Sequence, residues 1–130
     1  MKYIYPAVFE KEESGYSIFF PDVRGCYTSA ETVEEGIEMA NDALCLTLYH
    51  MEEDGQEIPA ASDISTLQNG PESFVTLISC DTIEYRKFYD NKAVKKTLTI
   101  PSWLNTMAER EDINFSAVLQ KALKAELKIA

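Results

Sequence analysis

The last forty residues carry more apolar surface than a unit of that size can bury by itself. Lys95–Pro101 alternates between polar and apolar residues, which predicts a short strand that the proline ends. Two helices are expected after it, one over Ser102–Arg110 and one from a cap at Asn114 to about Ile129. The second helix carries an apolar face that its small unit cannot cover alone. A lone strand and so wide a face become stable if two chains pair their strands and interlock their helices, so a homodimer or higher oligomer is expected.

The charges differ between the two parts of the chain. Met1–Asp81 holds 16 acidic and 3 basic residues, a net charge of −13, whereas Thr82–Ala130 holds 6 acidic and 9 basic residues, a net charge of +3. Such an asymmetry favours two modules with different partners. The acidic part repels nucleic acid and suits a basic protein, and the basic part can contact phosphate.

Composition also limits where the protein can reside in the cell and which disulfide or metal sites it can form. The three cysteines form no CxxC pair, and His50 is the single histidine, so neither a disulfide framework nor a metal site is expected. The N-terminus resembles no signal peptide, and no apolar run approaches the roughly 18 residues of a membrane span. A cytoplasmic protein without membrane contact is expected.

The N-terminal part predicts an α+β domain. Thr32 and Glu35 form a capping box at the start of an amphipathic helix that ends near Gly55. A long polar loop is expected over residues 56–72. Alternating or β-branched runs predict four strands, over Lys2–Glu10, Tyr16–Pro21, Cys26–Ser29 and Ser73–Cys80. We therefore expect one domain over residues 1–81, a linker that could hold a short helix over 82–91, and a second domain over 92–130.

The strand, proline, helix, turn and capped helix of residues 94–129 resemble the ribbon-helix-helix (β-α-α) fold of Arc- and MetJ-like repressors. The resemblance implies a dimer that binds operator double-stranded DNA through the outward residues of its paired strands. Counting back from Pro101, these residues are Thr99, Thr97 and Lys95. The amides near Asn114 and Ser116 would hold a phosphate, as helix N-termini do.

Four N-terminal segments resemble the HicB antitoxin family. They are Tyr5–Phe9, Gly15–Asp22, Gly25–Thr28 and the Thr32-x-x-Glu35 box, with Ala30 and Gly36 departing from the residues frequent in the family. The resemblance implies a reduced RNase H-like β-β-β-α-β domain that neutralises a HicA-like basic ribonuclease toxin, in a protein that represses its own operon. Within the matched segments, Tyr16, Phe20 and Asp22 are expected to contact the toxin.

Two other functions are compatible with the residues. The first is a DNA-binding regulator that senses a small molecule in a pocket under Tyr5, Tyr16 and Phe20. The second is an RNase H-like nuclease, which needs carboxylates that converge on two metal ions. The candidate carboxylates are Asp22, Glu31, Glu34 and Asp81. They share no motif, so no enzyme and no cofactor are expected.

Overall fold

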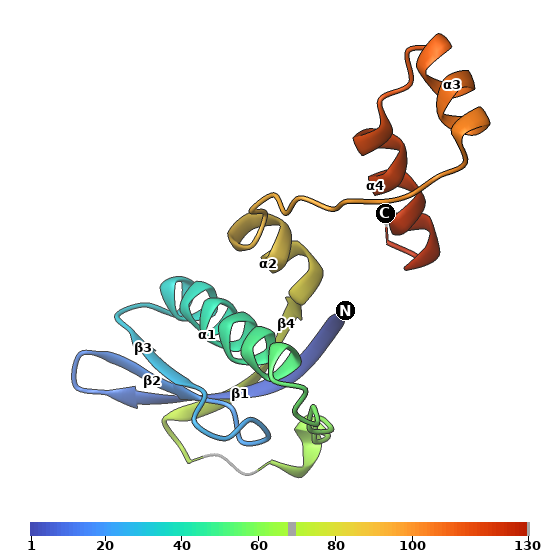
Figure 1. The fold of residues 1–130 in the computed structure, drawn as a ribbon. Coiled ribbons are helices and arrows are strands. Elements are labelled where there is room, and N and C mark those ends of the chain that lie inside the picture. Colours follow the sequence, from blue (N-terminus) through green and yellow to red (C-terminus); the bar gives the residue numbers. More distant parts are fainter. Residues whose placement is uncertain (68–69, 130) are drawn as a thin grey trace. The chain divides into compact units, whose positions relative to one another are not determined.

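The computed structural model divides into two units, Met1–Lys92 and Ala93–Ala130 (Figure 1). It describes residues 1–67 and 70–129. Residues 68–69 of the expected loop, and residue 130 at the end of the expected second domain, therefore lie outside the described residues.

The first unit is built on an antiparallel sheet with the strand order β3-β2-β1-β4. The four strands lie within two residues of the ends predicted from the sequence, which confirms a mixed α+β fold. They are β1 (Lys2–Glu12), β2 (Gly15–Phe19), β3 (Tyr27–Ala30) and β4 (Ser73–Asp81). The long connection before β4 contains a short 3-10 turn, η1 (Ile64–Thr66).

The β1–β2 turn requires a glycine. Gly15 has a φ of 106°, in the region that side chains rarely adopt, and a Cβ there would lie 2.2 Å from the carbonyl oxygen of Ala30. The turn can therefore approach the end of β3 only because Gly15 has no side chain.

Helix α1 (Val33–Glu53) begins and ends at the residues that the sequence predicts. The Thr32 hydroxyl accepts a hydrogen bond from the Glu35 amide at 3.1 Å. At the other end Gly55 adopts a φ of 67°, and the amides of Gly55 and Gln56 bond back to the carbonyls of Glu52 and Met51. This pair of bonds is a Schellman motif, which satisfies carbonyls that the helix itself leaves free.

The core lies between α1 and one face of the sheet (Figure 1). Alternate residues of β1, namely Tyr5, Ala7 and Phe9, point into it and meet Leu44 and Leu48 of α1. The three cysteines are free thiols inside this core, where they behave as small apolar residues.

A second helix, α2 (Thr82–Tyr89), follows β4 directly and packs against α1. The Asp81 carboxylate caps it by accepting from the amides of Ile83 and Glu84 at 3.0 and 3.4 Å. Further along, the Arg86 guanidinium lies 4.6 Å from the centre of the Tyr49 ring, a cation–π contact with α1. The segment expected as a linker therefore begins as an ordered helix of the first unit.

Glu52 is the centre of the contact between α1, β1 and α2. Its carboxylate accepts from the Tyr3 hydroxyl at 2.6 Å, the Thr82 hydroxyl at 3.0 Å and the Arg86 guanidinium at 3.1 Å. Burial opposes its ionisation, but these three donors outweigh burial and lower the pKa of Glu52. Burial and the bond to Glu52 raise the pKa of Tyr3 to about 12. Arg86 also pairs with the carboxylate of Glu53.

The second unit contains α3 (Ser102–Arg110) and α4 (Phe115–Glu126). Asp112 at φ 52° makes the turn between them, and the Ile113 amide bonds back to the Ala108 carbonyl at 3.2 Å. Helix α4 ends earlier than predicted, because Lys128 adopts a φ of 59° and the Ile129 amide bonds to the Lys124 carbonyl at 2.8 Å.

The strand predicted over Lys95–Pro101 is not formed in this single chain, in which residues 90–101 have neither helix nor strand structure. A strand is defined by the hydrogen bonds of its ladder, and the alternating pattern alone provides no neighbouring strand. A single chain therefore does not test whether residues 95–101 form a strand when two copies pair.

None of the helices in the described part of the chain is long and apolar enough to cross a bilayer.

Candidate nucleic-acid and protein interfaces

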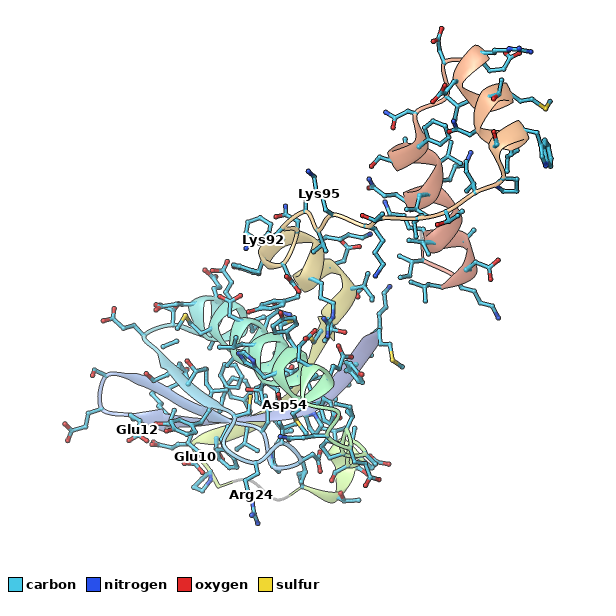
Figure 2. The ribbon with its side chains drawn as sticks, in the orientation of Figure 1. Glu10, Glu12, Arg24, Asp54, Lys92 and Lys95 are labelled. Carbon is cyan, nitrogen blue, oxygen red and sulfur yellow. The ribbon has the colours of Figure 1, made fainter. Side chains whose placement is uncertain are left out.

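The three residues expected to read DNA bases lie on the extended segment before α3. Lys95, Thr97 and Thr99 are all exposed there, and Figure 2 shows Lys95 projecting from this segment. The alternate apolar residues Leu98 and Ile100 are exposed as well, at 59% and 43%. One chain therefore leaves both faces of the segment open, and its apolar face is uncovered.

A shallow groove runs from the N-terminus of α4 along one side of the helix. It is lined by Asn114, Ser116, Ala117, Gln120, Lys121 and Lys124. The Asn114 side-chain oxygen caps the helix by accepting from the Ala117 amide at 3.0 Å, and the first turn contains no acidic residue. The positive end of the helix and two lysines meet on one surface, which suits an anion such as a phosphate.

The sequence argument found Asn114 and Ser116 but missed Lys121 and Lys124. Residues 114, 117, 121 and 124 recur at intervals of three and four, the spacing of one helix face. Applied to polar residues, this periodicity could have added the lysines to the predicted phosphate site.

No residue of the second unit is buried within its described part, residues 93–129. Large apolar side chains stay exposed in the segment and in both helices, among them Trp103 at 65% and Leu127 at 67%. Monomeric proteins rarely leave so many apolar side chains uncovered in so small a unit, which indicates an interface.

The residues expected to contact a toxin all make contacts within the first unit. Phe20 is buried, and Tyr16 is half-buried with its ring edge-on to Phe9 and Phe74, at centroid distances of 6.1 and 6.0 Å. The Asp22 carboxylate accepts from the Ser62 amide at 2.9 Å and from its hydroxyl at 2.5 Å. A toxin contact by these three residues stays a prediction.

The residues that the two other functions would use make contacts within the first unit. Tyr5 and Phe20 belong to the core, and the Tyr5 hydroxyl donates to the carbonyl of Pro59. Of the nuclease candidates, Asp22 binds Ser62 and Asp81 caps α2. Within residues 1–67 and 70–129, no group of three or more histidine, cysteine or acidic residues is arranged to hold a metal ion.

The structure thus defines a two-part protein, with an acidic α+β unit followed by a basic helical unit whose apolar face is open. The family model that describes the HicB-like antitoxin of bacterial toxin–antitoxin systems matches residues 5–123. The chain belongs to this family.

Two individual proteins are similar to this chain in sequence. A 14.9 kDa protein from the rep–hol intergenic region of Haemophilus phage HP1 is 32% identical over 104 residues, which cover 78% of this chain and 75% of that protein. Antitoxin HicB 2 of Photorhabdus laumondii is 41% identical over 58 residues, which cover 45% of this chain and 42% of that protein.

Solved structures show the same fold. A chain in a toxin–antitoxin complex from Streptococcus pneumoniae is 28% identical and matches with a TM-score of 0.63, covering 97% of this chain and 99% of that chain. The antitoxin HicB of Burkholderia pseudomallei, 21% identical, matches with a TM-score of 0.56 over 93% of this chain and 96% of that chain.

Proposed function

We propose that this chain is a cytoplasmic antitoxin that binds and neutralises a HicA-like ribonuclease toxin and represses its own operon. The observation that carries the proposal is the match to the antitoxin family over residues 5–123, nearly the whole chain. The related structures support the toxin partner, since one is a toxin–antitoxin complex from Streptococcus pneumoniae and another is a HicA3–HicB3 complex.

The acidic first unit is proposed to act on the toxin by binding alone. Residues 1–81 carry a net charge of −13, which attracts a basic protein over a distance and speeds encounter. Stable inhibition then depends on buried contacts rather than on net charge. The proposed domain is the reduced RNase H-like one, and it needs no cofactor and catalyses no reaction in this role.

The second unit is proposed to form a ribbon-helix-helix dimer on operator DNA. Two antiparallel copies of Lys95–Pro101 would satisfy each other's backbone groups and bury Leu98 and Ile100. The same pairing would aim Lys95, Thr97 and Thr99 of both chains into one major groove. The groove of α4, with Lys121 and Lys124, supports a phosphate contact beside it.

The test uses the full chain, the toxin encoded by the adjoining reading frame, and the promoter DNA of that gene pair. We expect this chain to suppress the ribonuclease activity of the toxin in proportion to its concentration, and to shift promoter DNA in preference to a random duplex. Full toxin activity in the presence of excess folded chain would overturn the antitoxin function. Equal affinity for both duplexes would overturn operator recognition.

A further inference from the structure

Strand β4 is a long edge strand of the sheet, in contact with β1, α1 and the short turn η1. It pairs with β1 on one side and is the last strand in the order β3-β2-β1-β4. The other edge strand, β3, has 4 residues, whereas β4 has 9. Proteins usually protect long edges with charges, prolines or bulges, yet Ser73–Cys80 contains no charged residue, proline or glycine. Such an edge is a template for another strand.

Two hydrogen bonds show which backbone groups of β4 face away from β1. The Glu72 carbonyl accepts a hydrogen bond from the Lys11 amide of β1 at 3.2 Å. The backbone N–H and C=O groups of even-numbered residues in this strand therefore face β1. The Ser79 carbonyl instead accepts from the Asn41 side chain of α1 at 2.5 Å, on the outer side. Because antiparallel strands alternate in this respect, Val75 and Leu77 also present their backbone groups outward. Within the described part of the chain, no bond to another segment occupies these outward groups.

A groove accompanies this edge, between α1 and β4. It is lined by Ile37, Glu38, Asn41, Asp42, Leu77, Ile78 and Ser79. Ile37 and Leu77 are 46% and 52% exposed, and the two carboxylates have no basic neighbour in the lining. Since Ile78 is buried beneath α1, the alternation of side chains places Leu77 on the face of the sheet away from α1.

We propose that the free edge of β4 accepts an extended strand of the toxin, so that the sheet of this chain continues into its partner. Alternate side chains of the added strand would face α1, where Glu38 and Asp42 select lysine or arginine with its stem over Ile37. The side chains between them would be apolar and would pack beside Leu77. The Asn41 side chain occupies the Ser79 carbonyl, so the free part of the edge ends there, near the C-terminal end of β4. This inference rests on the proposed function, because it specifies where that toxin binds.

A second copy of this chain fits the same edge poorly. An antiparallel pair of β4 strands would bring no cation to Glu38 or Asp42, because Ser73–Cys80 carries no charge. It would also place two acidic units beside each other, since residues 1–81 alone carry a net charge of −13, which disfavours association. The charges therefore favour a basic partner strand.

The first experiment measures amide hydrogen exchange in the full chain with and without the purified toxin of the adjoining reading frame. We expect the Val75 and Leu77 amides to exchange rapidly in the free chain and to become protected in the complex. Inhibition of the toxin with no protection at these two amides would overturn the inference and leave the proposed function standing. Protection in the free chain that disappears on dilution would indicate pairing between copies and would also overturn it.

The second experiment measures toxin affinity for two variants. Leu77→Pro removes an outward amide and leaves the ladder to β1 intact, as proline does on edge strands. Glu38→Lys with Asp42→Lys reverses the charge of the groove. We expect each variant to weaken toxin binding by about tenfold or more, because backbone bonds or close charge pairs are lost.

The matched control is Glu13→Lys with Glu57→Lys, which changes the net charge equally at exposed residues outside the groove. We expect the control to slow association and to leave the dissociation rate unchanged. Equal effects of the groove and control variants, or wild-type affinity in a folded Leu77→Pro chain, would overturn the inference. If the wild-type chain fails to bind the toxin, the proposed function fails instead.

Discussion

Gly36 of α1 packs against side chains of β1 and β2, and its replacement by alanine sets two known effects against each other. A Cβ at this position would lie 2.7 Å from Cε2 of Phe9 and 3.0 Å from Cδ1 of Ile18. The contact with Ile18 involves only the end of its side chain, which is also buried in the core. The Phe9 ring is fully buried and stacks on Phe74 at a centroid distance of 4.8 Å, so it has little room to move.

The expected net effect of Gly36→Ala is a loss of stability. Alanine is favoured over glycine inside a helix by about 1 kcal/mol, which sets the largest possible gain. Inserting one carbon into a well-packed core costs about 1–3 kcal/mol, and the rigid Phe9 ring places this site away from the low end. We expect a net loss of about 1 kcal/mol, which corresponds to a fall of roughly 4–8 °C in the melting temperature of a unit of this size.

Urea unfolding of the full chain, followed by circular dichroism, measures this change in the free energy of unfolding. The matched control repeats the substitution in a Phe9→Leu background, where the smaller side chain leaves space for the added carbon. There Gly36→Ala should be neutral or stabilising, so the two changes should be strongly non-additive. A Gly36→Ala chain that is more stable than wild type would refute the packing argument.

Four further changes test the docking of α2 and the proposed DNA contact. Arg86→Ala should destabilise the first unit by about 1–2 kcal/mol in thermal unfolding, because charged hydrogen bonds and a cation–π contact are lost together. Glu52 has a lowered pKa, so its contribution to stability is present above its unfolded value of about 4.3 and is lost as the pH falls through the folded value. Stability measured from pH 6 to pH 3 should therefore fall less steeply in Glu52→Gln, and an unchanged slope would contradict this assignment. If Thr97 reads a base, Thr97→Ala should cost about 1–3 kcal/mol per base contact in operator affinity and spare binding to a random duplex. Lys96→Ala should at most lower both affinities together with the salt dependence, and equal behaviour of the two variants would argue against base reading by this segment.

The sequence was sufficient for most features of the first unit that depend on neighbours along the chain. The Thr32 cap of α1 and the turn at Gly55 were predicted because such hydrogen bonds join residues at most five apart. The strands were predicted to within two residues because alternating, β-branched and aromatic runs favour extended backbone. Failures began where a second segment decides the conformation. Residues 95–101 have a strand pattern and no ladder in one chain. The end of α4 is a local exception that the sequence pattern missed, because Lys128 adopts a conformation that favours glycine.

The sequence by itself determined the four strands and α1 of the first unit, the caps of α1 and the division of charge, because all of these are local or additive properties of residues. Only the tertiary structure placed β4 at the edge of the sheet, beside Glu38 and Asp42 of α1, and brought Arg86 to Glu52. These residues lie more than thirty positions apart, and no periodicity encodes which strand is outermost or which carboxylate faces a given arginine. Such contacts follow from the packing of whole elements, which minimises exposed apolar surface and unpaired backbone groups over the entire unit at once.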